Sequence, residues 1–230
     1  MFNLKSHIKA KSVDEAISLL GQNRNTRLIA GGTDVLIKLR HGNQSFEDLV
    51  DINGLKELKF IKKDENENIL IGSGVVFNDI VESDIIAACV PILQDAASSV
   101  GGPQIRNMAT IGGNICNGVT SADSASGLFA LNAILQLKST EGMREISIKD
   151  FYLGPGKVDL KPTEVLTAIK ITPENYKGFF GFYYKYAMRK AMDIATIGCA
   201  VNLRLNNKKI EDYRIAYGVA GPVPMRCSIT

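Results

Sequence analysis

Residues 110–124 read Thr-Ile-Gly-Gly-Asn-Ile-Cys-Asn-Gly-Val-Thr-Ser-Ala-Asp-Ser, and the rest of the chain is organised around this stretch. It contains three glycines, two asparagines and four hydroxyl residues, and it lies between segments whose apolar patterns predict a helix and a strand. Glycine has no Cβ to hold a ligand away, so successive backbone N–H groups of such a loop can converge on an anion. A tight turn between core elements explains the run equally well.

A second glycine-rich loop lies nearer the amino terminus. The apolar stretch Leu28-Ile29-Ala30 predicts a buried strand, and it runs directly into Gly31-Gly32-Thr33-Asp34. Two such loops could hold the two phosphates of a pyrophosphate between them, because each charge-assisted N–H bond contributes about 1.5–3 kcal/mol. This pairing predicts a pyrophosphate site that needs no lysine.

The hydrophobic periodicity predicts alternating helices and strands first, and mostly strands at the end. Helices are expected over 12–21, 91–100 and 124–133, and strands over 28–30, 49–52, 69–72, 134–137, 164–171, 199–205 and 213–218. We expect a hairpin or meander between the strands at 49–52 and 69–72, and another hairpin between the last two strands. The predicted class is α+β, with a domain boundary in the polar segment 174–178.

Composition excludes several classes of function. The net charge of +3 comes from 27 basic and 24 acidic residues in short mixed runs, which predicts no nucleic-acid partner. The four cysteines include no Cys-x-x-Cys pair, and His7 and His41 are the only histidines, so no metal site or serine triad is indicated. Without a signal-like or membrane-length apolar run, we expect a cytoplasmic protein with no membrane contact.

Two stretches partly match nucleotide-binding motifs, but each lacks a required residue. Gly72-Ser73-Gly74 begins like Gly-x-Gly-x-x-Gly, but Phe77 stands where the third glycine belongs, which disfavours a Rossmann domain. Gly154-Pro155-Gly156-Lys157 is superficially similar to a P-loop, yet Val158 stands where the magnesium-binding hydroxyl belongs. We interpret this second stretch as a turn.

At their separation, Ala30-Gly31-Gly32-Thr33-Asp34 and Thr110-Ile111-Gly112-Gly113-Asn114-Ile115 resemble the FAD-binding subunits of molybdenum hydroxylases, and within that family the bacterial xanthine dehydrogenase branch. The similarity extends through 102–107, 118–124, 154–157 and 185–189. It implies a vanillyl-alcohol oxidase/p-cresol methylhydroxylase-type FAD-binding domain of two α+β subdomains over 1–176. A carbon monoxide dehydrogenase flavoprotein C-terminal-like domain, incomplete against the family's usual length, would follow over 177–230.

The resemblance also implies a site. Two segments would serve the FAD pyrophosphate, one residue would reach the ribose or adenine end, two would lie against the isoalloxazine, and two would border it from the second domain. In that order these residues are Arg27, Leu28, Ile29, Ala30, Gly31, Gly32, Thr33 and Asp34 with Ala109, Thr110, Ile111, Gly112, Gly113 and Asn114; then Asp123; then Val165 and Leu166; and finally Tyr184 and Lys185. Catalytic residues and metal ligands are not implied.

The function that the resemblance implies is electron relay. Substrate is hydroxylated at a molybdopterin centre, electrons pass through two [2Fe-2S] clusters, and the flavin reduces NAD. Since this chain lacks cluster spacing, those centres would lie on iron-sulfur and molybdopterin-binding partner subunits. No histidine or cysteine lies in a loop positioned like a flavin-linking site, which favours non-covalent FAD. Alternatives are a carbon monoxide, nicotinate or aldehyde dehydrogenase complex, or an assembly module that binds no flavin.

Overall fold

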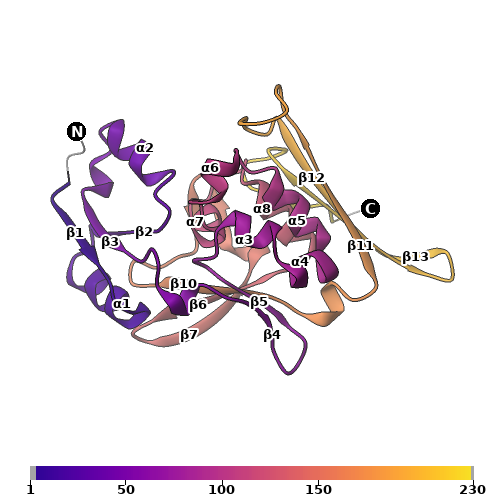
Figure 1. The fold of residues 1–230 in the computed structure, drawn as a ribbon, viewed down its shortest axis with the longest axis horizontal. Coiled ribbons are helices and arrows are strands. Elements are labelled where there is room, and N and C mark those ends of the chain that lie inside the picture. Colours follow the sequence, from indigo (N-terminus) through magenta and orange to yellow (C-terminus); the bar gives the residue numbers. More distant parts are fainter. Residues whose placement is uncertain (1–3, 229–230) are drawn as a thin grey trace.

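The computed structural model describes residues 4–228. In Figure 1 the amino-terminal lobe lies on one side, a second lobe of sheet and helices fills the middle, and a terminal sheet stands against the opposite side of those helices. The second lobe packs its helices on an antiparallel sheet and the terminal unit consists of strands, so the predicted α+β class is confirmed.

The first lobe is a parallel three-stranded sheet of order β1-β3-β2. Ser12 begins its longer helix by accepting a hydrogen bond from the Glu15 N–H, and the helix packs Ile17 and Leu20 into a small core with Val50. Its elements are β1 (Ser6–Lys9), α1 (Val13–Gln22), β2 (Arg27–Ile29), α2 (Val35–Arg40) and β3 (Asp48–Asp51), with the 3-10 turns η1 (Gln44–Phe46) and η2 (Lys56–Leu58).

The second lobe is an antiparallel five-stranded sheet of order β4-β5-β10-β6-β7, with helices α3–α8 over one face (Figure 1). Its large core includes the fully buried Phe77, Ile92 and Ile111. Its elements are β4 (Ile61–Lys63), β5 (Ile69–Gly72), α3 (Phe77–Val81), α4 (Asp84–Cys89), α5 (Pro91–Ser98), α6 (Pro103–Arg106), α7 (Ile111–Cys116), α8 (Asp123–Ala130), β6 (Ile134–Ser139), β7 (Gly142–Ser147), α9 (Ile148–Phe151), β8 (Tyr152–Gly154), β9 (Lys157–Val158), β10 (Val165–Ile171) and η3 (Pro173–Asn175).

The terminal sheet has the order β11-β12-β13-β14 and packs on α5 and α8. Side chains alternate across a strand, so Tyr183 is buried against the helices while Phe182 and Tyr184 are exposed on the outer face. The expected terminal hairpin is present as β12 and β13. The elements are β11 (Phe179–Tyr186), β12 (Ile197–Asn206), β13 (Lys209–Gly218) and β14 (Met225–Arg226).

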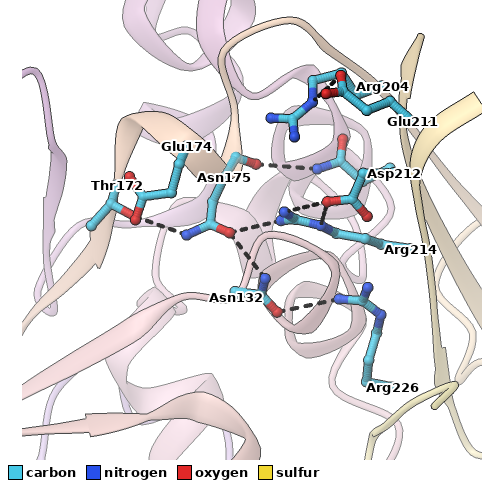
Figure 2. A network of polar contacts seen from close by, with 10 residues as sticks. Asn132, Thr172, Glu174, Asn175, Arg204, Glu211, Asp212, Arg214 and Arg226 are labelled. Carbon is cyan, nitrogen blue, oxygen red and sulfur yellow. Dashed lines mark hydrogen bonds and ion pairs between the residues drawn. The ribbon is translucent and has the colours of Figure 1, made fainter. Parts of the chain in front are cut away.

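A polar network attaches this sheet to the second lobe, as Figure 2 shows. Asn175 Oδ1 accepts hydrogen bonds from Arg214 at 2.7 Å and from the Asn132 side chain at 2.9 Å, and Asn175 Nδ2 donates to Thr172 at 2.8 Å. Arg214 also lies over the Phe179 ring. Residues Asn132, Thr172 and Asn175 belong to the second lobe, whereas Arg214 belongs to β13. The network therefore holds the terminal sheet against the second lobe.

Two expectations about secondary structure are wrong. The strands at 49–52 and 69–72 do not pair, because β3 belongs to the first lobe and β5 pairs with the short lysine-rich strand β4, which periodicity missed. The run 110–124 is not all loop, since it contains helix α7, which Thr110 caps. The boundary at residue 176 stays a prediction, and the ends of the predicted domains at 1–3 and 229–230 lie outside the described residues.

The helices between residues 4 and 228 are all too short or too polar to cross a membrane.

Candidate functional site

A cavity of about 480 Å³ lies where the first lobe meets helix α7 and the start of β10. Both glycine-rich segments contribute to its walls, together with Val165 and Leu166, although these residues are far apart in the sequence. The cavity therefore collects most of the positions expected to contact a flavin, and the roles of those positions stay predictions.

The first glycine-rich segment connects β2 to α2 and follows one wall of the cavity. Gly32 has a φ of 73°, a left-handed conformation that glycine adopts without strain. Within residues 4–228, no oxygen accepts a hydrogen bond from the backbone N–H groups of residues 30–34. These successive donors have no partner among the described residues, as a cradle for an anionic ligand requires.

The second segment uses its N–H groups differently. The Ile111 and Gly112 N–H groups donate to the carbonyls of Val75 and Ser73, each at 2.9 Å, and the Gly113 N–H donates to Thr110 Oγ1 at 3.1 Å. These donors hold α7 against the loop after β5. The first segment therefore carries the unpaired donors, whereas the second offers mainly glycine surface to the cavity.

The glycines have distinct steric roles. A Cβ on Gly31 would lie 1.8 Å from the Met108 carbonyl oxygen, and one on Gly112 would lie 2.5 Å from Ser73 Cβ, so both glycines are required by the packing of neighbouring segments. A Cβ on Gly113 would meet only Thr110 Oγ1, at 3.0 Å. Gly113 also lines the cavity, and among these three glycines it is the one with the most room for a side chain.

Basic side chains dominate the charge around the cavity. Lys38 of α2 donates to Asn117 Oδ1 at 2.5 Å, and both residues line the cavity, so this bond joins the first lobe to the end of α7. Arg27 and Lys161 also line it. From the sequence we expect a pyrophosphate site that needs no lysine, and two lysines, Lys38 and Lys161, line this cavity.

The acidic Glu164 lines the cavity but its charge is compensated. Its two carboxylate oxygens accept hydrogen bonds from Arg144 at 2.7 and 2.8 Å, and Arg144 also contacts Asp159 at 3.0 Å. Burial opposes the ionised form, yet the hydrogen bonds from Arg144 and from the Lys161 N–H hold the pKa of Glu164 below its ordinary 4.5. This pair fixes the segment that leads into β10.

The remaining predicted residues do not line the cavity. The side chains of Ile29 and Ile111 belong to hydrophobic cores. Asp123 is buried and accepts hydrogen bonds from Tyr183 and Lys185, each at 2.8 Å; burial raises its pKa above 3.8 against the opposing effect of Lys185 and Tyr183.

Tyr184 and Lys185 are neighbours on β11 and point to opposite faces of the terminal sheet. Lys185 turns inward to Asp123, whereas Tyr184 is 59% exposed on the outer face.

Sequence reasoning missed several cavity residues. Lys38 lies one helical turn after Asp34, so its position beyond a glycine loop was a usable signal. Gly156 belongs to the stretch that we interpreted as a turn, an interpretation that the β8–β9 connection confirms, and tertiary packing against Gly118 brings it to the cavity. Cys116 ends α7 and lines the cavity, where burial raises the pKa of its thiol to about 12.

Two family models together match most of the chain. The family model described as FAD binding domain in molybdopterin dehydrogenase matches residues 2–174, and that of the CO dehydrogenase flavoprotein C-terminal domain matches residues 182–230. The chain is 46% identical over 227 residues to a xanthine dehydrogenase FAD-binding subunit of Escherichia coli O157:H7, with 99% of this chain and 78% of that protein covered.

More distant relatives are similar in sequence or in structure. A glyceraldehyde dehydrogenase medium chain of Sulfolobus acidocaldarius is 36% identical, with 96% of this chain and 77% of that protein covered. The solved structure of a carbon monoxide dehydrogenase from Hydrogenophaga pseudoflava superposes with a TM-score of 0.92 at 32% identity, covering 98% of this chain and 78% of that chain. The chain therefore belongs to the FAD-binding medium subunits of the molybdenum hydroxylases, a family of FAD-dependent oxidoreductase subunits.

Proposed function

We propose that this chain binds FAD non-covalently at the cavity and relays electrons from [2Fe-2S] clusters on a partner subunit through FAD to NAD. The complex would be of the xanthine dehydrogenase type, with a further subunit that holds molybdopterin, and the cytoplasm stays the predicted compartment. The single observation that carries the proposal is the row of unpaired N–H groups at residues 30–34 beside the cavity. Such a row fits a pyrophosphate, which carries negative charge and several acceptor oxygens.

The other cavity residues fit the same ligand. Arg27 and Lys38 would supply positive charge to the phosphates, and Val165 with Leu166 would present an apolar wall to the isoalloxazine. Three predicted residues, Asp123, Tyr184 and Lys185, do not line the cavity, and their roles at the ribose or adenine end and at the border of the flavin stay predictions. Bound FAD would supply the exchange between one-electron transfer and hydride transfer, which no side chain provides.

The test begins with the purified chain. We expect a yellow protein that releases about one equivalent of FAD on denaturation, and flavin-free protein that takes FAD up again in a calorimetric titration. A colourless protein that FAD does not reconstitute would overturn the flavin assignment and favour an assembly module.

The substrate of the whole complex needs a separate experiment. The 36% identity to a glyceraldehyde dehydrogenase medium chain and to a carbon monoxide dehydrogenase medium chain keeps those substrate classes as the second candidates. We expect the co-purified complex to reduce NAD with hypoxanthine, and not with an aldehyde, nicotinate or carbon monoxide. NAD reduction with one of the latter alone would refute the xanthine dehydrogenase assignment while leaving the flavin assignment intact.

A further inference from the structure

Ser73 lines the cavity and carries a buried hydroxyl that has no hydrogen-bond partner among residues 4–228. The residue is 5% exposed, directly follows β5, and its Oγ has no hydrogen-bond partner in the structure. Two other buried side-chain polar atoms between residues 4 and 228 share this state, on Tyr152 and Arg226, and neither residue lines the cavity.

The backbone N–H and carbonyl of Ser73 both form hydrogen bonds, so the role of the side chain can be tested separately from that of the main chain. Its N–H donates to the Thr167 carbonyl of β10 at 3.0 Å, and its carbonyl accepts from the Gly112 N–H of α7 at 2.9 Å. These two bonds would be unchanged by an alanine at this position. A buried hydroxyl without a partner costs about 1–3 kcal/mol, so the oxygen does not serve the stability of the ligand-free fold.

We propose that Ser73 is a further flavin-binding residue, whose hydroxyl donates a hydrogen bond to an oxygen of the sugar-phosphate chain of the nucleotide. The inference rests on the proposed FAD function. Ser73 lies against Gly112, in the segment assigned to the pyrophosphate, and on the cavity wall that also includes Leu166. A phosphate or ribityl oxygen at this wall would accept the hydrogen bond of the Ser73 hydroxyl, which has no partner within the described part of the chain.

The test compares two quantities, the thermal stability of the flavin-free protein and its affinity for FAD. Ser73→Ala removes an unsatisfied polar atom, so the flavin-free variant should unfold at the same temperature as wild type or higher. Its dissociation constant for FAD should rise roughly tenfold, as expected when one hydrogen bond to a charged or polar ligand atom is lost. Thermal unfolding and calorimetric titration of FAD into flavin-free protein measure the two effects without any activity assay.

Ser83→Ala is the matched control. The Ser83 hydroxyl accepts a hydrogen bond from the Ile86 N–H at the start of α4, and Ser83 does not line the cavity. This variant should lose thermal stability and keep its affinity for FAD.

The outcomes separate the two claims. If wild type binds FAD and Ser73→Ala binds it equally well, the Ser73 assignment is wrong while the proposed function stands. If wild type takes up no FAD, both are overturned. A flavin-free Ser73→Ala protein that unfolds earlier than wild type would show that the hydroxyl serves the fold, and this result also overturns the assignment.

Discussion

Replacing Asp123 by asparagine tests whether the terminal sheet depends on a buried charge pair. In the wild type one carboxylate oxygen accepts from Tyr183 and the other from Lys185, and only 13% of the Lys185 side chain is exposed. An asparagine keeps a single acceptor oxygen and removes the negative charge that neutralises the Lys185 ammonium. Lys185 would keep the Ser99 carbonyl at 3.1 Å as a partner.

The magnitude follows from these contacts. Breaking a buried pair by removing one partner costs about 3–5 kcal/mol. Burial already penalises the Asp123 carboxylate, whose pKa is raised, and Lys185 keeps one partner, so we expect the lower end, about 3 kcal/mol. For a domain of this size the unfolding temperature should then fall by roughly 6–12 °C.

Differential scanning calorimetry of flavin-free protein at neutral pH measures this loss, because the pair exists without a ligand. Glu145→Gln is the control: Glu145 pairs with Lys170 and its side chain is 45% exposed, so the same carboxylate-to-amide change should cost about 0–1 kcal/mol. If Asp123→Asn and the control destabilise equally, the pair does not secure the sheet and the reasoning fails.

Three further predictions concern the cavity and the domain contact. Gly113→Val adds a side chain at the cavity wall and should weaken FAD binding at least roughly tenfold in titration, while Gly21→Ala, where a Cβ meets nothing within 4 Å, should leave it unchanged. Because the pKa of Glu164 is lowered in the folded protein, the carboxylate stabilises the fold above about pH 4.5, and this stabilisation is lost as the pH falls through the lowered pKa. Glu164→Gln should therefore make the free energy of unfolding depend less on pH in the acid range. Arg214→Met leaves Asn175 Oδ1 one donor short and should cost about 1–3 kcal/mol by urea unfolding.

Each of these three predictions has an outcome that would contradict it. Normal FAD content in Gly113→Val would mean that α7 does not border the ligand. An unchanged acid limb in Glu164→Gln would mean that its pairing with Arg144 does not persist in solution. Arg214→Met with wild-type stability would show that the network of Figure 2 does not hold the terminal sheet.

Local patterns in the sequence were enough for elements whose signals are short-range. The helix that begins after Ser12 was predictable because one hydroxyl, one glutamate and an apolar stripe lie within two turns. The terminal hairpin was predictable because strict alternation over two strands flanks an asparagine-rich turn. Strand pairing beyond neighbours was not: β5 and β10 are adjacent in space but separated by about a hundred residues, and nothing local marks that contact.

For the candidate site, too, some features could be predicted from local sequence and others could not. The sequence by itself determined the two glycine-rich segments and the family, since glycine at a defined spacing is a local property and motif similarity needs no coordinates. Only the tertiary structure decided which segment keeps its N–H groups unpaired, that Lys38 and Ser73 reach the cavity, and that Asp123 pairs with Lys185. These are facts about hydrogen-bond partners and burial, and both depend on atoms brought together from distant parts of the chain.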